Sequence, residues 1–238
     1  HFTGGFAEYV LLPKGSSIFK IPRELSDEEV APLMCAGACI INGFDMAKLG
    51  NCDYVLVQGC GALGMYSCAF AKELGAANVI AIDPIKKRIE LAKEFGADYV
   101  INASEETEES IISKVMEITQ NRGADYGIET AGKPEVIRSG FKMLRIGGKY
   151  MIFGAIYPGD NVTIDSHDLT TKCLQLFGIH NYSPIHLEKT IKLMQKAREK
   201  YPFKKLVGPT FELSKEGVES ALKAQKSRDA LRPAIIPK

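Results

Sequence analysis

The chain has 238 residues, a formal net charge of +1 and 45% hydrophobic residues, which is the composition of an ordinary globular protein. A near-neutral balance without a basic block argues against nucleic acid or an anionic membrane surface as a partner. No apolar run approaches the roughly 18 residues of a membrane span, and no signal peptide is recognised.

Six cysteines are dispersed along the chain, and none forms a CxxC pair. Most lie among apolar residues, which predicts reduced, buried thiols instead of a disulfide framework, so we expect a cytoplasmic protein. The first residues, His1-Phe2-Thr3, read like the middle of a domain, and we expect the chain to be a fragment of a longer protein.

Short extended segments and then a helix are predicted at the start of the chain. Residues 6–12 alternate as a β-strand does, and residues 16–21 form a second extended stretch. Ser26 and Glu29 have the spacing of a capping box, which predicts a helix that begins at Asp27. We expect this helix to break near Pro32 and to resume to about residue 48.

A glycine-rich turn follows a short apolar strand. The strand is predicted at Tyr54–Gln58, and the turn reads Gly59-Cys60-Gly61-Ala62-Leu63-Gly64. Gly59 permits a sharp turn, Gly61 lets a pyrophosphate approach the backbone, and Gly64 lets the next helix pack against the sheet. A chance glycine cluster at a tight turn is the alternative reading.

An acidic residue, Asp83, ends the next predicted strand at residues 78–82. A carboxylate there accepts hydrogen bonds from both ribose hydroxyls of an adenosine and repels a 2′-phosphate, which favours NAD over NADP. The basic residues Lys86, Lys87 and Arg88 leave the alternative open, because they could hold a 2′-phosphate or could simply face solvent.

Strands and helices then alternate. Further strands are expected at 98–102, 126–129 and 149–153, with helices at 85–95, 111–118 and 134–145. This alternation predicts an α/β fold with a doubly wound parallel Rossmann sheet. Because ligands bind at the carboxyl ends of such strands, the turns at Gly59, Asp83, Thr130 and Gly154 should lie together.

The pattern changes after about residue 161. Short strands are expected at 162–164, 173–179 and 234–236, and amphipathic helices at 185–201 and 214–227.

Four motifs together resemble the medium-chain, zinc-type alcohol dehydrogenase/reductase family over essentially the whole chain. They are Gly4–Val10, Ala31–Gly37, Gly59–Gly64 with Asp83, and Gly147-Gly148-Lys149 with Phe153-Gly154. The resemblance implies a Rossmann NAD-binding domain at residues 37–175. Residues 1–36 and 176–238 would be remnants of a GroES-like catalytic domain.

The same resemblance implies zinc-dependent hydride transfer between a small alcohol or aldehyde and NAD in the intact protein. Cys35 corresponds to the third zinc ligand, and the other ligands belong to an N-terminal portion that is not in this sequence. We therefore expect this chain alone to hold no catalytic zinc and to be inactive. A homodimer or homotetramer is implied, through edge strands that follow about Gly159.

The resemblance also assigns roles to single residues. Leu63 would pack on the nicotinamide, Arg88 would approach the adenosine ribose, and Thr130, Phe153 and Gly154 would line the cofactor cleft. Cys39 would lie near the nicotinamide in place of the family's usual threonine. Arg232 would reach the pyrophosphate.

The substrate pocket would be bordered by Tyr157 and by the turn at residues 180–182. The histidines His167, His180 and His186 are read as structural or surface residues.

Two other functions are compatible with the residues alone. One is a non-catalytic nucleotide-binding module, in which Cys35 is an ordinary free cysteine of a helix. The other is a methyltransferase that uses S-adenosylmethionine, since those enzymes also have a glycine-rich first loop and an acid after the second strand. Gly64 and the return of the chain to a second domain argue against the methyltransferase.

Overall fold

The fold is built on one six-stranded parallel sheet, seen in a computed structural model that describes residues 5–154, 158–159, 161–227 and 230–237. The strand order is β3-β2-β1-β4-β5-β6. The strands are β1 Cys52–Gln58, β2 Ala76–Asp83, β3 Tyr99–Asn102, β4 Ala124–Glu129, β5 Leu144–Ile152 and β6 Gln175–Gly178. This is the predicted doubly wound Rossmann sheet, and the order reverses between β1 and β4, where such sheets bind ligands.

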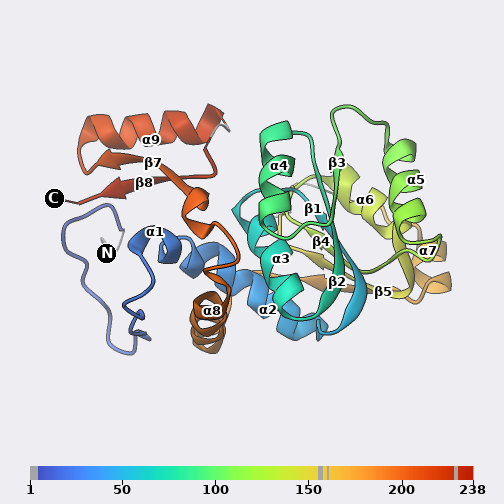
Figure 1. Ribbon diagram of the computed structural model, residues 1–238, viewed down its shortest axis with the longest axis horizontal. Coiled ribbons are helices and arrows are strands. Elements are labelled where there is room, and N and C mark those ends of the chain that lie inside the picture. Colours follow the sequence, from blue (N-terminus) through green and yellow to red (C-terminus); the bar gives the residue numbers. More distant parts are fainter. Residues whose placement is uncertain (1–4, 155–157, 160, 228–229, 238) are drawn as a thin grey trace.

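Helices cover both faces of this sheet (Figure 1). One face carries α2 Ala38–Ala47, α3 Ala62–Glu73 and α4 Lys86–Glu94; the other carries α5 Glu108–Ile118, α6 Pro134–Lys142 and α7 Ser166–Thr171. The residues of β1 alternate between the two cores, since Val55 and Val57 enter the first and Leu56 the second. Burial on both faces explains why the central residues 55–57 of this parallel strand are all apolar.

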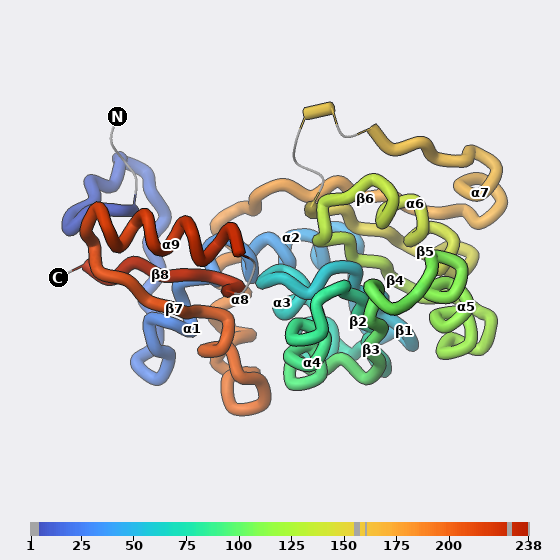
Figure 2. The backbone as a smooth tube through the Cα atoms, turned by 90° about the horizontal axis from the view of Figure 1, so that it is seen from above, coloured from blue at the N-terminus to red at the C-terminus, as the bar shows by residue number. Residues whose placement is uncertain are grey.

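The other elements are α1 Asp27–Val30, the π-helix η1 Leu33–Gly37, α8 Pro184–Ala197, the 3-10 helix η2 Phe203–Leu206, β7 Val207–Glu212, α9 Lys215–Ser227 and β8 Arg232–Ile236. Of these, η1 and α8 share the core of α2 and α3. The strands β7 and β8 form a separate parallel pair. Figure 2 shows α9 and these two strands beside the blue N-terminal segment.

Segments before the sheet contact segments that follow it in the chain. The side-chain amide of Gln195 donates to the Glu24 carboxylate at 2.8 Å, and the Tyr182 hydroxyl donates to the Met34 carbonyl. Phe203 stacks on Tyr66 of α3 with ring centroids 5.6 Å apart. The expected boundary between residues 175 and 176 falls inside β6, so the large sheet extends to residue 178.

Three short extended segments differ from expectation. Residues 6–12, 16–21 and 162–164 form no strand, because none of the described strands pairs with them. The strand β7 was not predicted, since the Gly208-Pro209 pair within it is typical of a turn. Pairing with β8 overrides that local preference.

The expectation about membrane spans also needs correction. The helical stretch Asp27–Ala47 is 21 residues long with a mean hydropathy of 1.5, so by length and composition alone it could cross a membrane. Such a stretch is weak evidence for a span, because the core helix of a globular protein passes the same test. Here 56% of the window is buried, and the stretch packs against α3 and α8.

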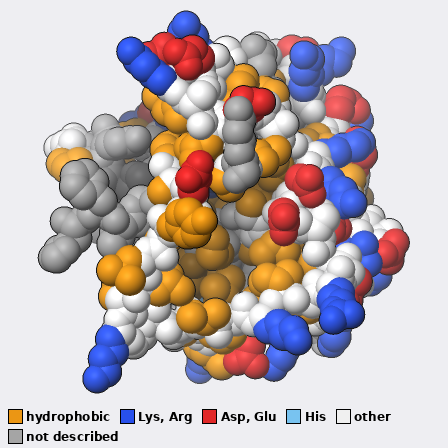
Figure 3. All heavy atoms as spheres, turned by 90° about the vertical axis from the view of Figure 1, so that its left-hand side faces the viewer, with side chains coloured by type: hydrophobic (Ala, Val, Ile, Leu, Met, Phe, Trp, Pro, Cys, Tyr) orange, Lys and Arg blue, Asp and Glu red, His pale blue; other side chains and the backbone are white. Residues whose placement is uncertain are grey.

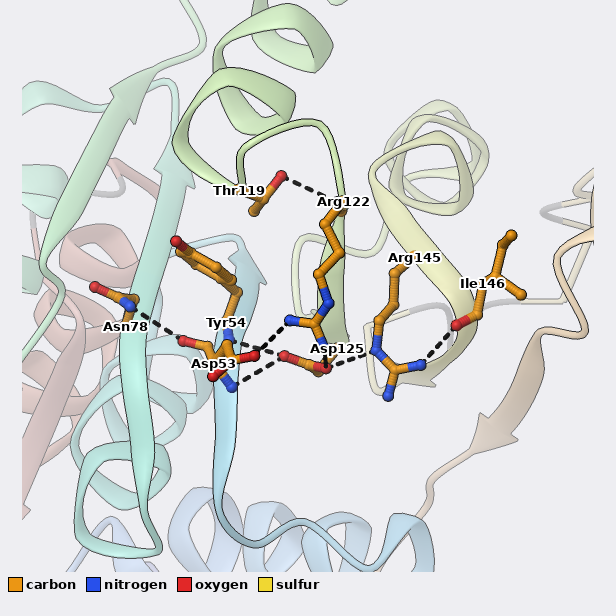
Figure 4. A network of polar contacts seen from close by, with 9 residues as sticks. Asp53, Tyr54, Asn78, Thr119, Arg122, Asp125, Arg145 and Ile146 are labelled. Carbon is orange, nitrogen blue, oxygen red and sulfur yellow. Dashed lines mark hydrogen bonds and ion pairs between the residues drawn. The ribbon is translucent and has the colours of Figure 1, made fainter.

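A polar network ties the amino ends of the strands together (Figure 4). The Asp125 carboxylate of β4 accepts hydrogen bonds from the backbone N–H groups of Asp53 and Tyr54 at 3.0 and 2.9 Å. It also pairs with Arg122 at 2.9 Å and Arg145 at 2.6 Å. A cavity of about 450 Å³ opens beside it, but its charged side chains neutralise one another, so we assign it no ligand.

Asp125 is ionised in spite of its burial. Burial opposes ionisation, but the hydrogen bonds from Tyr54 and Arg145 and the charge of Arg122 outweigh it and hold its pKa below the ordinary value of 3.8. A depressed pKa means that the ionised carboxylate stabilises the fold above that ordinary value. The contribution is lost as the pH falls through the lower, folded-state pKa.

We expect Asp125→Asn to lower the free energy of unfolding by about 3 kcal/mol at neutral pH, because it leaves two guanidinium groups without their shared carboxylate. Urea unfolding followed by circular dichroism measures this loss. The difference in the free energy of unfolding between the variant and the unmodified chain should become smaller in acid, where Asp125 is protonated.

The matched control is Asp53→Asn, because the Asp53 side chain is 66% exposed and also pairs with Arg122. Its loss should be below about 1 kcal/mol. Equal losses in the two variants would contradict the central role of Asp125.

Candidate functional site

The glycine-rich turn after β1 has the predicted conformation. Gly59 adopts φ +100°, a value that favours glycine, and its N–H donates to the Ile82 carbonyl of β2 at 2.8 Å. A Cβ at residue 64 would stand 1.9 Å from the Gly59 carbonyl oxygen, so only glycine lets α3 pack this closely. A Cβ at residue 61 would meet no atom within 4 Å, so the space above Gly61 is open to a ligand.

The amino end of α3 faces the same open space. The helix begins at Ala62 with Gly61 as its N-cap, no side chain caps it, and its first turn contains no acidic residue. The first N–H groups of a helix have no partner within the helix, and the helix dipole places partial positive charge there. This end of α3 is therefore suited to an anion such as a pyrophosphate.

Asp83 stands beside this turn, at the carboxyl end of β2. Its side chain is buried, one oxygen accepts from the Cys60 N–H at 2.7 Å, and the other accepts from the Ile85 N–H at 2.8 Å. Each carboxylate oxygen has two lone pairs, so both oxygens retain capacity for a further donor. The backbone thus holds the carboxylate in one orientation, ready to accept from a ligand's hydroxyl groups.

A cavity of about 560 Å³ connects these groups. It is lined by Gly59, Gly61, Asp83 and Arg88, and also by residues that follow β4: Thr130, Ala131, Lys133, Glu135, Val136 and Ser139. Gln225 of α9 also lines it. The cavity lies at the carboxyl ends of β1, β2 and β4, where the strand order predicts a ligand.

The other predicted residues lie at different distances from this cavity. Thr130 lines it, and its hydroxyl donates to the Gly59 carbonyl at 2.7 Å. Leu63, in the first turn of α3, is half-buried and packs partly against the core. Phe153 does not line the cavity: its ring is buried against Gly43 of α2.

Gly154 allows two turns of the chain to approach each other closely. A Cβ at residue 154 would stand 2.3 Å from the Gly132 backbone nitrogen. The residue must therefore be glycine so that the turns after β4 and β5 can touch each other.

Glu129 is a residue of this site that the sequence argument missed. It is the last residue of β4 and is fully buried. Its carboxylate accepts from the backbone N–H groups of Gly132 at 2.5 Å and Gly154 at 3.2 Å. The available signal was an acid at the end of an apolar strand, directly before Thr130-Ala131-Gly132, which repeats the position of Asp83 on β2.

Cys35 lies in the π-helix η1 and is exposed. Its sulfur is 3.6 Å from a guanidinium nitrogen of Arg232, the residue that was expected to reach the pyrophosphate. Among the described residues, no group of three or more histidine, cysteine, aspartate or glutamate side chains could hold a metal. Because zinc needs three or four protein ligands, the residues present do not fit a catalytic zinc by themselves.

The remaining predicted residues have mainly structural contacts. The Cys39 thiol donates to the Asn181 carbonyl at 3.5 Å, and burial raises its pKa. His186 accepts from the Ser183 N–H at 3.1 Å and lies 3.4 Å from the Asp45 carboxylate, as expected of a structural histidine. All six cysteines are free, as expected, but only Cys60 and Cys68 are buried, so the expectation of buried thiols was wrong for the others. Tyr157 lies outside the described residues.

Known proteins with related sequences are dehydrogenases. The chain is 28% identical to the 5-exo-hydroxycamphor dehydrogenase of Pseudomonas putida over 233 residues, covering 98% of the chain and 64% of that enzyme. It is 37% identical to the L-threonine 3-dehydrogenase of Pyrococcus horikoshii over 180 residues, covering 74% of the chain and 49% of that enzyme. The chain thus spans between about half and two-thirds of the length of these curated relatives.

Solved structures agree. The alcohol dehydrogenase of Thermotoga maritima superimposes with a TM-score of 0.83 and 31% identity, over 90% of this chain and 59% of that one. The benzyl alcohol dehydrogenase of Acinetobacter calcoaceticus superimposes with a TM-score of 0.81 and 26% identity, and the match covers 92% of this chain and 59% of that one. Residues 62–196 match the family model described as zinc-binding dehydrogenase. With its glycine-rich turn, its Rossmann sheet and this match over more than half of its length, the chain belongs to the zinc-binding dehydrogenase family.

Proposed function

We propose that this chain binds NAD in the cavity at the carboxyl ends of β1, β2 and β4. The observation that carries the proposal is the open space above Gly61, between the uncapped amino end of α3 and the fixed carboxylate of Asp83. The pyrophosphate would lie on the helix terminus, and the adenosine ribose would donate to Asp83. Arg88, which lines the same cavity, would lie beside that ribose.

For the whole protein we propose hydride transfer between a small alcohol or aldehyde and NAD. Sequence relatives that are themselves dehydrogenases support this oxidoreductase class. The proposal places zinc only in the intact protein, with Cys35 as one ligand, and this chain alone would bind the cofactor without turnover. A cytoplasmic location and a homodimer or homotetramer formed through a sheet edge remain part of the proposal.

A larger catalytic domain is also proposed. Figure 3 shows hydrophobic side chains gathered around a hollow at the end of the molecule that carries the N-terminal segment, β7 and β8. The exposed apolar residues there include Phe6, Tyr9, Leu11 and Ile236. Apolar surface of this kind favours contact with another folded part. This supports the assignment of the segments before and after the Rossmann sheet to one catalytic domain that extends beyond them.

We expect Gly61→Val to weaken NADH binding at least tenfold, because a branched side chain would occupy the space proposed for the pyrophosphate. The thermal unfolding midpoint should change little, since no atom lies within 4 Å of the position of the added Cβ. Titration of NADH followed by its fluorescence measures the affinity.

Gly50→Val is the matched control, because Gly50 also has open space around it and lies outside the cavity. It should bind NADH as the unmodified chain does. Binding of S-adenosylmethionine but not NADH by the unmodified chain would refute the proposed function itself.

Asp83 should set the preference between the two nicotinamide cofactors. We expect the unmodified chain to bind NADH at least tenfold more tightly than NADPH, because a buried carboxylate repels the 2′-phosphate. Asp83→Asn removes the charge at constant size and should reduce that ratio to about threefold or less. Competition titrations with the two reduced cofactors measure the ratio.

The control is Asp53→Asn, because Asp53 lies near the amino end of β1, away from the cavity. It should leave the ratio of the two affinities unchanged. A preference for NADPH in the unmodified chain would mean that Arg88 and its basic neighbours determine the cofactor and that Asp83 does not.

A further inference from the structure

The buried carboxylate of Glu129 joins two turns of the chain. Besides the bonds from Gly132 and Gly154, the backbone N–H groups of Ala131 and Lys133 also favour its ionised form. Burial is the larger influence and raises its pKa, and these donors partly offset it. A fully buried acid whose hydrogen-bond partners are backbone N–H groups is costly to place in a core, so its presence calls for a specific explanation.

The first of these turns forms one wall of the cavity. Thr130 and Ala131 line it directly after Glu129. The Thr130 N–H donates to the Gln58 carbonyl at 2.9 Å, and the Thr130 hydroxyl donates to the Gly59 carbonyl at 2.7 Å. A Cβ at residue 59 would stand 2.8 Å from the Ala131 nitrogen, so this turn rests on the glycine-rich turn itself.

The second turn, after β5, packs against the first. The position of a Cβ at residue 154 lies 2.3 Å from the Gly132 nitrogen and 3.0 Å from a carboxylate oxygen of Glu129. The carboxylate therefore lies where three turns meet, those after β1, β4 and β5. The turns after β1 and β5 both carry glycines that were expected at the cofactor site, Gly59, Gly61 and Gly64 in the first and Gly154 in the second.

A carboxylate meets a requirement that other side chains do not. Its two oxygens accept up to four hydrogen bonds and donate none, which matches a ring of N–H groups. Glutamine has the same shape, but its NH₂ group would face donors. An aliphatic residue would leave the N–H groups buried without partners.

Resting on the proposed function, we propose that Glu129 is a positioning residue for NAD binding. It acts through the turn at residues 130–133, which it holds against the glycine-rich turn, and it does not itself touch the cofactor. Glu129 thus ends β4 as Asp83 ends β2, but Asp83 would touch the cofactor directly, whereas Glu129 would act through the turn.

The test compares NADH affinity with stability in Glu129→Gln. We expect the dissociation constant for NADH to rise about tenfold or more, because the turn loses acceptors for its N–H groups. Amide hydrogen exchange in the peptide that spans residues 130–133 should become faster in the same variant. Unchanged NADH affinity in a folded Glu129→Gln variant would overturn the proposal.

The matched control is Tyr150→Phe, which removes a different buried polar group close by. The Tyr150 hydroxyl donates to the Gln58 side chain at 2.5 Å and to the Val136 carbonyl at 3.4 Å, so neither of these hydrogen bonds goes to the turn at 130–133. It should lower the thermal midpoint, yet leave NADH affinity within about threefold. A loss of affinity as large as that of Glu129→Gln would reduce Glu129 to a general stabilising role and would also overturn the proposal.

A second variant keeps the proposal testable if Glu129→Gln does not fold. Thr130→Val keeps the size of the side chain but removes the hydroxyl bond to Gly59, through which the turn is joined to the glycine-rich turn. We expect about a tenfold loss of NADH affinity, and unchanged affinity would refute the proposed route. Absence of NADH binding in the unmodified chain would instead refute the underlying function, so the two failures are distinguishable.

Discussion

The close contact between α3 and the turn after β1 is the constraint on which the site depends. The helix axis can approach the sheet only because residue 64 carries no side chain, and that approach directs the free N–H groups of α3 toward the edge of the sheet. The same turn fixes Asp83, since the Cys60 N–H that donates to it belongs to the turn. Helix terminus, open space and carboxylate are therefore consequences of one packing contact.

The acidic residues at the two ends of the strands have different partners. At the amino ends of the strands, the charges of Asp125, Arg122 and Arg145 neutralise each other and bind the strands together. At the carboxyl ends, Asp83 and Glu129 are buried acids whose oxygens accept from backbone N–H groups. The ion pairs of Asp125 thus lie at the amino ends, whereas the proposed cofactor cavity lies at the carboxyl ends.

The parts of the fold that depend on local sequence were predicted well. The strands and helices of the sheet have apolar patterns that continue through each element, and their order follows from the alternation of strand and helix. Segments whose structure depends on a partner elsewhere were predicted poorly. Residues 6–12 alternate like a strand and are not one, whereas β7 contains Gly208 and Pro209 and is a strand, because β8 pairs with it.

The site divides in the same way. The sequence by itself determined the glycine-rich turn and Asp83, because their chemistry follows from residue type and spacing along one strand–turn–helix unit. Only the tertiary structure decided the roles of Glu129, Gly154 and Arg232. The roles of Glu129 and Gly154 depend on which turns contact each other, and that of Arg232 depends on its contact with Cys35 in η1. Contacts between residues far apart in the sequence leave no periodic signal, and the packing of three turns around one buried carboxylate is visible only after the sheet has formed.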